Sequence, residues 1–256
     1  MLYSETSGNG ADLVMLHGWG MHSAIWGEAL DRLSARYRVT TVDLPGHGRS
    51  PALTPPHATD LSRVAAAVAK VVPERAAWLG WSLGGLVAMQ AALAFPARVS
   101  RLILVATNAS FVRRPGWLHA QTAATLDGFA AGLHGDYRAV LQRFLALQAW
   151  GSEDARRQVR LLRERLFLHG EPDPQALAAG LTLLKESDLC GLLAGINQPV
   201  LLVAGENDGL VPSAALEAMA RLLPDARLEQ IPGAGHAPFL SHPARFEAAM
   251  AAFFDE

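Results

Sequence analysis

The stretch AAWLGWSLGGLVAMQAALAF, residues 76–95, decides the fold of this chain. Its first part, 76–81, is a short apolar run typical of a buried strand, and 83–95 is typical of a helix. Ser82 therefore lies between two glycines at a sharp strand-to-helix turn, in the pattern G-x-S-x-G, where small neighbours relieve steric crowding. The pattern predicts a serine nucleophile, although the same residues also fit a simpler role for Ser82 as the N-cap of the helix.

Short apolar runs and helical patterns alternate along most of the chain. The expected strands are 12–17, 37–43, 76–81, 101–106, 199–205 and 226–231, and the expected helices are 22–35, 60–71, 83–95, 213–222 and 243–254. Nearly continuous apolar strands are typical of a parallel sheet that is buried on both faces. The alternation predicts an α/β fold with a mostly parallel, doubly wound sheet.

The alternation stops between residues 110 and 190. Four helical patterns follow one another there without a strand, at 119–133, 136–149, 152–168 and 174–185. We interpret 110–190 as a helical cap inserted over the carboxyl edge of the sheet, which leaves 1–109 and 191–256 as the core. The alternative is that these are ordinary crossover helices.

The composition is that of an ordinary globular protein. The chain has 256 residues, of which 50% are hydrophobic and 18% charged, and its formal net charge is −2, so nothing in its charge favours binding to nucleic acid or to an anionic membrane. A single cysteine, Cys190, excludes an internal disulfide and a cysteine-based metal cluster. The amino terminus lacks the pattern of a signal peptide, and no apolar run approaches the ~20 residues of a membrane span. We therefore expect a cytoplasmic monomer without a cofactor or a metal.

A serine hydroxyl needs a general base, and the base needs a carboxylate to orient it. Where a serine lies on this kind of strand-to-helix turn, the order along the chain is Ser, then Asp or Glu, then His. His236, in the glycine-rich stretch GAGHAPFLSHP (233–243) after the last expected strand, is the candidate base. We interpret His242 as a helix cap or surface residue, and His17 as a strand-end residue with no carboxylate placed for it.

Two acidic residues follow the expected strand 199–205 and are candidates for the orienting carboxylate. Asp208 lies where the loop turns and is favoured over Glu206. Asp43, at the end of another expected strand, is the main rival, and we interpret it as a residue that stabilises the loop after it.

Ester hydrolysis by a serine also requires an oxyanion hole, which is a set of hydrogen-bond donors for the charge that develops on the carbonyl oxygen. The backbone N–H of Leu83, directly after the serine, is the expected first donor. The loop HGWGMH (17–22) follows the expected strand 12–17, and the N–H of Trp19 in this loop is the expected second donor.

Six stretches together resemble the pimeloyl-[acyl-carrier protein] methyl ester esterase family of the α/β-hydrolase superfamily. They are LHGWG (16–20), VDLPGHGRS (42–50), LGWSLGGLVA (79–88), RFLALQ (143–148), GLVP (209–212) and HAPFLSHP (236–243). The resemblance covers nearly the whole chain. Many α/β hydrolases share HG, DLPGHGRS and G-x-S-x-G, whereas GWSLGG and RFLALQ are more specific.

The resemblance implies a serine esterase of biotin synthesis, which converts the methyl ester of pimeloyl-acyl carrier protein to pimeloyl-acyl carrier protein and methanol. It implies a catalytic triad of Ser82, Asp208 and His236. The substrate contacts that it implies are Trp19, Leu83, Phe144, Leu145, Ala146, Leu147 and Gln148. Two alternatives stay open: a broader esterase, thioesterase or lactonase of the same fold, and a hydrolase-fold protein that binds a ligand as a sensor.

An apolar tunnel between the cap and the sheet would suit a seven-carbon acyl chain. Its expected lining is Trp19, Trp81, Phe129, Phe144 and Leu147. The same side chains also fit ordinary core packing, and for Phe129 the two interpretations are equally good.

The carrier protein that the resemblance implies is small and acidic, so it would favour a basic docking surface. Residues 134–170 contain seven arginines and four acidic residues, a local charge of +3. Arginine suits the geometry of carboxylates and phosphates. We expect Arg138, Arg143, Arg156 and Arg160 to bind the carrier; the alternative is a solvated arginine surface with local salt bridges.

Overall fold

The computed structural model describes residues 1–54, 57–149 and 155–255. Its centre is a seven-stranded sheet in the order β1-β3-β2-β4-β5-β6-β7. The strands are β1 (Ser4–Ser7), β2 (Ala11–Leu16), β3 (Tyr37–Val42), β4 (Ala76–Trp81), β5 (Val99–Val105), β6 (Val200–Gly205) and β7 (Ala226–Ile231). Strands β2 to β7 pair in parallel, and β1 pairs antiparallel with β3. The expected α/β fold with a mostly parallel sheet is therefore confirmed.

Strand β1, at the edge of the sheet, was not expected from the sequence. Its four residues, SETS, are polar, and the middle two are exposed. The strand forms through its backbone ladder with β3, in which Ser4 pairs with Val42 and Ser7 with Val39. A search for apolar runs cannot find a strand that the backbone alone specifies.

Strand β4 lies in the middle of the sheet and leads into the strand-to-helix turn. All six of its residues are buried, because β2 and β5 flank it and helices cover both faces of the sheet. Helix α3 (Leu83–Ala94) begins directly after Ser82 and packs back against β4 and β5. The strand, turn and helix expected for residues 76–95 are thus present.

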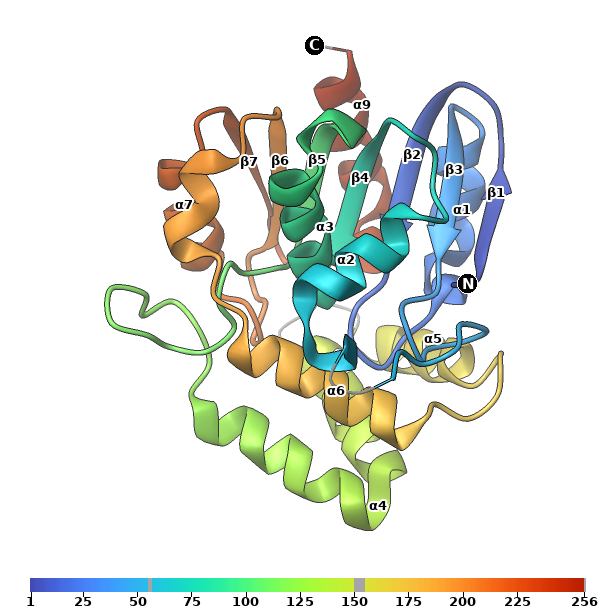
Figure 1. The fold of residues 1–256 in the computed structure, drawn as a ribbon, viewed down its shortest axis with the longest axis vertical. Coiled ribbons are helices and arrows are strands. Elements are labelled where there is room, and N and C mark those ends of the chain that lie inside the picture. Colours follow the sequence, from blue (N-terminus) through green and yellow to red (C-terminus); the bar gives the residue numbers. More distant parts are fainter. Residues whose placement is uncertain (55–56, 150–154, 256) are drawn as a thin grey trace.

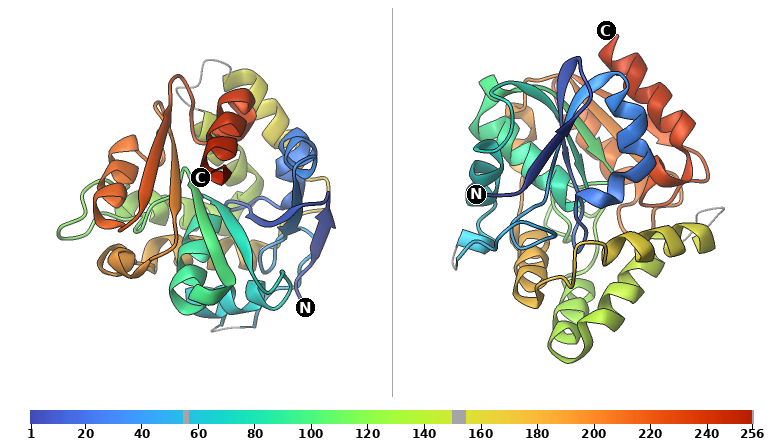
Figure 2. Two further views of the ribbon diagram at one scale, coloured as in Figure 1. Left: turned by 90° about the horizontal axis from the view of Figure 1, so that it is seen from above. Right: turned by 90° about the vertical axis from the view of Figure 1, so that its right-hand side faces the viewer.

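Helices cover both faces of the sheet (Figures 1 and 2). Helices α2 (Leu61–Ala69), α3 and α7 (Ser213–Leu222) lie on one face, and α1 (Gly27–Ser34) and α9 (Pro243–Phe254) lie on the other. The helix expected over 22–35 is divided, because the backbone turns at Gly27, where φ is 38°. The short elements are η1 (Ser23–Trp26), η2 (His57–Thr59), η3 (Pro96–Arg98) and α8 (Pro238–Ser241).

Three long helices lie between β5 and β6: α4 (Ala123–Ala149), α5 (Ala155–Leu166) and α6 (Pro174–Glu186), followed by the short η4 (Cys190–Gly195). They gather at one end of the sheet (Figure 1). The loops at the carboxyl ends of the strands reach them there: the Trp19 indole N–H donates to the Leu177 carbonyl at 2.8 Å, and the His236 N–H donates to the Gln148 carbonyl at 3.0 Å.

The expected helices 119–133 and 136–149 correspond to the two parts of α4. These parts meet at Asp136, whose φ of −139° and ψ of 85° are not helical. The beginning of the expected helix 152–168 lies outside the described residues. Of the helices that the structure describes, none is both long and apolar enough to cross a membrane.

Candidate active site

The turn between β4 and α3 places Ser82 in a backbone conformation that side chains rarely adopt, with φ 54° and ψ −117°. A Cβ atom at Gly80 would collide with the Gly84 backbone, and one at Gly84 would collide with the end of β2. The Ser82 N–H donates to the Val105 carbonyl at 3.0 Å, and the Thr107 hydroxyl donates to the Ser82 carbonyl at 2.7 Å. These contacts hold a conformation that costs about 1–3 kcal/mol, and strain of this kind is typical of functional residues.

The Ser82 side chain does not cap α3, since it forms no capping hydrogen bond within the described part of the chain. The turn therefore differs from an ordinary N-cap, in which the serine oxygen accepts a bond from the first turn of the helix. The hydroxyl is left free for another role.

The loops after β6 and β7 bring an acid and a base together. Asp208 Oδ2 lies 2.8 Å from His236 Nδ1, and both side chains are buried. Asp208 Oδ1 accepts the N–H groups of Leu210 at 2.8 Å and Val211 at 3.0 Å, so the carboxylate cannot rotate freely. Because a carboxylate only accepts, Nδ1 of the neutral ring donates and Nε2 remains an acceptor. Nε2 is buried and has no hydrogen-bond partner in the described part of the chain, so it is available to receive a proton.

The loop that carries His236 is held directly against the strand-to-helix turn. The indole N–H of Trp81, the residue before Ser82, donates to the His236 carbonyl at 2.8 Å. The indole and imidazole ring centroids are 5.7 Å apart. On the other side, the His236 N–H donates to the Gln148 carbonyl of α4. Serine, imidazole and carboxylate are thus gathered at the carboxyl ends of β4, β7 and β6.

The loop after β2 passes close to the same turn. A Cβ atom at Gly18 would approach Ser82 Cβ to 3.2 Å and the Trp81 ring to 3.1 Å, so a larger residue here would press on both neighbours. Trp19 follows and is fully buried. Leu83 is the first residue of α3, and the N–H of a first helical residue has no acceptor within its own helix. The two expected oxyanion donors therefore belong to segments that meet beside Ser82.

His17 is a structural residue, because both of its ring nitrogens are occupied. Nδ1 donates to the Gly18 carbonyl at 2.8 Å, and Nε2 accepts the Leu44 N–H at 2.9 Å. Burial, together with the nearby His47, lowers the pKa of His17 from 6.5 to about 3. The ring is therefore neutral at physiological pH, in agreement with Nε2 being an acceptor.

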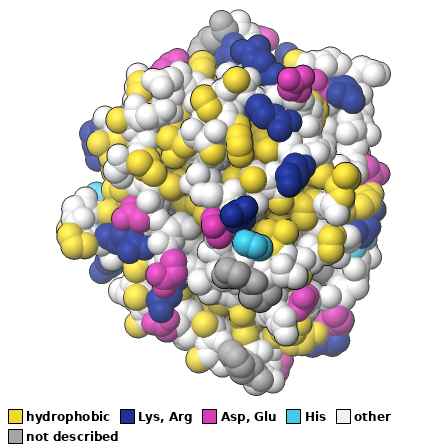
Figure 3. Space-filling view, in the orientation of Figure 1, with side chains coloured by type: hydrophobic (Ala, Val, Ile, Leu, Met, Phe, Trp, Pro, Cys, Tyr) yellow, Lys and Arg dark blue, Asp and Glu magenta, His cyan; other side chains and the backbone are white. Residues whose placement is uncertain are grey.

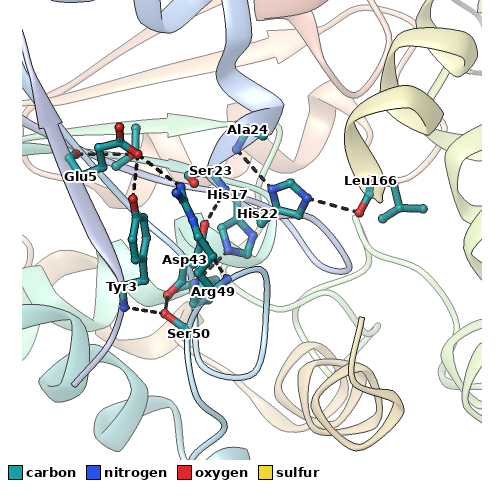
Figure 4. Close-up of polar contacts among 12 residues, drawn as sticks. Tyr3, Glu5, His17, His22, Ser23, Ala24, Asp43, Arg49, Ser50 and Leu166 are labelled. Atoms are coloured by element: carbon teal, nitrogen blue, oxygen red, sulfur yellow. Dashed lines mark hydrogen bonds and ion pairs between the residues drawn. The ribbon is translucent and has the colours of Figure 1, made fainter. Parts of the chain in front are cut away.

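Asp43 stabilises the loop that follows β3 (Figure 4). Its Oδ1 accepts the Ser23 N–H at 2.7 Å and its Oδ2 accepts the Arg49 N–H at 2.9 Å. Its carbonyl accepts the Ser50 hydroxyl at 2.5 Å. These bonds agree with the structural interpretation of Asp43 made from the sequence.

Glu206 and His242 lie apart from the acid–base pair. Glu206 is exposed, and its Oε2 accepts the Gly233 N–H at 3.0 Å. His242 lies between α8 and α9, and its Nδ1 is 2.9 Å from the Ser241 hydroxyl. Neither residue competes with Asp208 or His236 for its place in the site.

Three of the expected lining residues form an aromatic cluster, in which Phe129 and Phe144 of α4 contact Trp19 of the loop after β2. The Trp19 and Phe144 rings pack edge to face at 4.7 Å between centroids, and Phe129 packs against both. Trp81 lies elsewhere, among Trp26 and Phe239. Trp81 was expected to line the tunnel. In the structure its indole packs in the core and supports the His236 loop.

The stretch 144–148 lies at the carboxyl end of α4. Phe144 and Leu145 are buried, Leu147 is half-buried and Ala146 is exposed. The Gln148 side chain is buried, and neither its amide oxygen nor its amide nitrogen has a hydrogen-bond partner among the described residues. An unpartnered buried amide is costly unless another group satisfies it, so Gln148 is suited to a polar group of a ligand.

A cavity of about 360 Å³ lies between α6 and the core, and Leu83 forms part of its wall. Of the residues expected to line an apolar tunnel or contact the substrate, only Leu83 borders this cavity. The small residues of α6 that form its wall carry no signal that distinguishes them, in the sequence, from ordinary helix residues.

The expected docking arginines lie on α4 and α5, and two of the four border one hollow. Arg138 and Arg160 border a hollow of about 500 Å³ together with Gln142, Arg163, Glu164 and Phe167. Arg138 also pairs with Glu171. The Arg143 guanidinium lies 5.6 Å from the centroid of the Phe129 ring, and Arg156 is exposed. Arg163 was counted among the seven arginines of this region but was not one of the four expected to bind the carrier, although it follows Arg160 at helical spacing.

The described residues contain no group of three or more His, Cys, Asp or Glu side chains that could hold a metal ion. The carboxyl ends of β4, β6 and β7 carry a serine hydroxyl, a buried carboxylate and a buried imidazole. Such a set can carry out acyl transfer to water.

Comparison with known proteins agrees with this geometry. Residues 13–243 match the α/β hydrolase fold family. The chain is 45% identical to the pimeloyl-[acyl-carrier protein] methyl ester esterase of Nitrosomonas europaea, with 96% of each chain covered. It is 44% identical to the esterase of the same name from Methylococcus capsulatus, with 95% of this chain and 94% of that one covered. Among solved structures, a hydrolase from Pseudomonas aeruginosa is 27% identical and superposes with a TM-score of 0.85, covering 100% of this chain and 94% of that chain.

Proposed function

The chain belongs to the pimeloyl-[acyl-carrier protein] methyl ester esterase family of α/β hydrolases, and we propose that it hydrolyses the methyl ester of a pimeloyl chain borne by acyl carrier protein. The products are the carrier-linked acid and methanol, and the reaction is a step of biotin synthesis. The observation that carries the proposal is the buried Asp208–His236 pair, which the hydrogen bond from the Trp81 indole to the His236 carbonyl holds against the strained Ser82 turn.

In the first half of the reaction Ser82 Oγ attacks the ester carbonyl while His236 Nε2 takes its proton. The Asp208 carboxylate accepts the Nδ1–H bond at 2.8 Å and stabilises the imidazolium that forms. The backbone N–H groups of Leu83 and Trp19 donate to the carbonyl oxygen as it becomes negative. His236 then protonates the methoxide, which leaves as methanol, and the acyl group remains on Ser82.

In the second half a water molecule attacks the acyl-enzyme. His236 Nε2 accepts a proton from this water and returns a proton to Ser82 Oγ when the intermediate collapses. The carrier-linked carboxylate is released, and the free serine and neutral imidazole are restored.

The cap, residues 110–190, would position the acyl arm. The side chains of Phe144 and Gln148 belong to the part of α4 that reaches the His236 loop, and the buried aromatic cluster of Trp19, Phe129 and Phe144 lies next to it. The arm would reach the site beside this cluster, with the Gln148 amide available to a polar group of the arm.

The arginine hollow between α4 and α5 would bind the acidic carrier. Arg138, Arg160 and Arg163 converge there, and guanidinium groups bind carboxylate and phosphate oxygens in a bidentate manner. Arg143 and Arg156 would add to this surface at its margins. The cytoplasmic location, the monomeric state and the absence of nucleic-acid or membrane partners stay predictions from the sequence.

The direct test is a genetic and biochemical pair of experiments. A biotin-requiring strain that lacks its own esterase should grow without biotin when it expresses this chain, and should not grow when it expresses Ser82→Ala at the same level. Failure of the well-expressed wild type would favour the broader esterase, thioesterase or lactonase alternative. Ester hydrolysis that survives Ser82→Ala would show that Ser82 is not the nucleophile. If the wild-type protein bound esters without cleaving them, the sensor alternative would be favoured.

A further inference from the structure

Helix α6 is a firmly seated element that contacts the loop carrying Trp19. It packs against α3 and α4, and Leu177 and Gly180 are among its buried residues. Its first turn is capped by the Asp173 side chain, which accepts the Gln175 N–H at 2.8 Å. Apolar side chains also dominate the outer face of the molecule on which α2 and α6 lie, with scattered charges among them (Figure 3). The α6 backbone is therefore a fixed support for the side chains that it touches.

Gly180 of α6 lies against the side chains of both proposed oxyanion donors. A Cβ atom at Gly180 would come to 2.6 Å from Trp19 Cδ1 and 3.0 Å from Trp19 Nε1, and to 3.6 Å from Leu83 Cδ2. The distance to Trp19 Cδ1 is shorter than real Cβ contacts, whereas the distance to Leu83 is an ordinary contact. The absence of a side chain at Gly180 is thus what lets α6 approach the Trp19 indole so closely.

The Trp19 indole has little room to yield to a larger neighbour. It is fully buried, and protein interiors are close-packed. Its Nε1–H donates to the Leu177 carbonyl of α6 at 2.8 Å. Its ring packs edge to face on Phe144 of α4, with 4.7 Å between the centroids. The indole is clamped between α4 and α6, so a push from Gly180 would be passed on to the Trp19 main chain.

The peptide group between Gly18 and Trp19 carries the proposed second oxyanion donor. Its carbonyl oxygen, which belongs to Gly18, accepts the Met21 N–H at 3.2 Å and the His17 Nδ1–H at 2.8 Å. A planar trans peptide points its carbonyl and its N–H in opposite directions, so these two bonds fix the direction of the Trp19 N–H. The loop therefore sets the direction of this donor, and the clamp on the indole sets its position.

We infer that Gly180 is a positioning residue for the oxyanion hole. Because it lacks a side chain, it seats the Trp19 indole, and through the indole the Trp19 N–H, at the place beside Ser82 where the carbonyl oxygen becomes negative. Gly180 acts through Trp19 and does not touch the reacting atoms. The inference rests on the proposed function, because that function assigns the oxyanion donors.

Gly180→Ala tests the inference with one added methyl group. The Trp19 indole would have to move from 2.6 Å to at least the 3.4 Å at which ordinary contact with a Cβ atom begins. A misplacement of about 1 Å costs up to about 10²-fold in rate. We therefore expect kcat on p-nitrophenyl acetate to fall by about tenfold to a hundredfold. KM should stay within about threefold of the wild type, because the oxyanion contact strengthens only in the transition state.

Gly128→Ala is the matched control. It adds the same methyl group to another helix, α4, at a position where the new Cβ meets nothing within 4 Å, and it should leave kcat and KM unchanged.

Two readouts separate a positioning role from a general disturbance of the fold. The pH dependence of kcat/KM should keep its midpoint in Gly180→Ala, because the Asp208–His236 pair is not touched. The inhibition constant of a small trifluoromethyl ketone, which adds to Ser82 and leaves an oxyanion, should rise by the same factor by which kcat falls.

The decisive comparison repeats Gly180→Ala in a Trp19→Ala background, where there is no indole to displace. There the substitution should change kcat by less than about twofold. If Trp19→Ala does not fold, Trp19→Phe takes its place: the smaller ring lacks the bond to Leu177 and can shift, so the loss caused by Gly180→Ala should shrink by at least about threefold.

Three results would overturn the inference. They are a folded Gly180→Ala enzyme that keeps about half or more of the wild-type kcat, a rise in KM in place of the fall in kcat, and an equal loss with and without the Trp19 indole. Failure of the proposed function is distinguishable, since the wild type would then leave the carrier-linked methyl ester intact while p-nitrophenyl acetate was still cleaved and still reported on Gly180.

Discussion

Replacement of Asp208 by asparagine tests the acid–base pair with almost no change in shape. Asp208 Oδ1 accepts the N–H groups of Leu210 and Val211, and Oδ2 accepts from His236 Nδ1. An asparagine that keeps its oxygen on the two backbone donors turns its amide N–H toward Nδ1. Two donors cannot face each other, so the imidazole changes to the tautomer in which Nδ1 accepts and Nε2 carries the proton. Nε2 can then no longer receive the proton of Ser82.

The expected loss in kcat is about 10⁴-fold, the size found when a triad aspartate is made neutral, and this corresponds to about 5 kcal/mol of transition-state stabilisation. Initial rates on p-nitrophenyl acetate at pH 7.5 measure it. Glu206→Gln, on the same loop, is the matched control, because Glu206 contacts Gly233 and not the imidazole; it should stay within about threefold of the wild type. If folded Asp208→Asn kept a tenth or more of the wild-type rate, the assignment of Asp208 as the orienting carboxylate would be wrong.

Three other predictions concern docking, packing and pH. The double reversal Arg156→Glu and Arg160→Glu should raise KM for a carrier-linked ester about tenfold more than it raises KM for p-nitrophenyl acetate, because negative charges would then face the acidic carrier. Equal changes in KM on both substrates would argue against docking at these arginines. Gly84→Ala should lower the free energy of unfolding in urea by about 1–3 kcal/mol, because the new Cβ would collide with the end of β2. Gly128→Ala, whose Cβ would meet nothing within 4 Å, should be neutral or stabilising. Equal midpoints of urea unfolding for the two variants would refute the packing argument. Burial lowers the pKa of His17 from 6.5 to about 3, so below pH 6.5 the unfolded chain binds a proton that the folded chain does not. The free energy of unfolding should therefore fall on acidification by up to about 1.4 kcal/mol per pH unit. His17→Gln should reduce this slope between pH 6.5 and 5, and an unchanged slope would contradict the account.

The strands of the core could be predicted because they are buried on both faces, which makes them continuous apolar runs. The catalytic candidates could be predicted for a related reason. Ser82 and Asp208 each follow such a run, whereas His236 follows the edge strand β7, which is only partly buried. The carboxyl ends of parallel strands meet at one edge of a sheet. The polar edge strand β1 escaped prediction because its backbone pairing with β3 leaves no trace in the hydrophobic pattern.

The surroundings of the candidate site were harder to predict, since they depend on the orientation of buried side chains. Every residue of β4 is buried, so the pattern does not reveal that the Trp81 indole turns toward the His236 carbonyl and the core. Arginine spacing on a helix does not reveal that Arg143 lies over the Phe129 ring while Arg163 joins Arg138 at the hollow. The α6 cavity depends on small side chains whose spacing resembles that of any helix.

Intact-mass spectrometry of the carrier tests the central claim most directly. Acyl carrier protein loaded with the methyl ester of pimeloyl is mixed with the enzyme, and its mass is followed with time beside a Ser82→Ala control. The account predicts that the carrier loses one methylene in mass, as the ester becomes the acid, and keeps its thioester-linked chain. Loss of the whole acyl chain from the carrier, or no change in mass with an enzyme that is active on small esters, would contradict it.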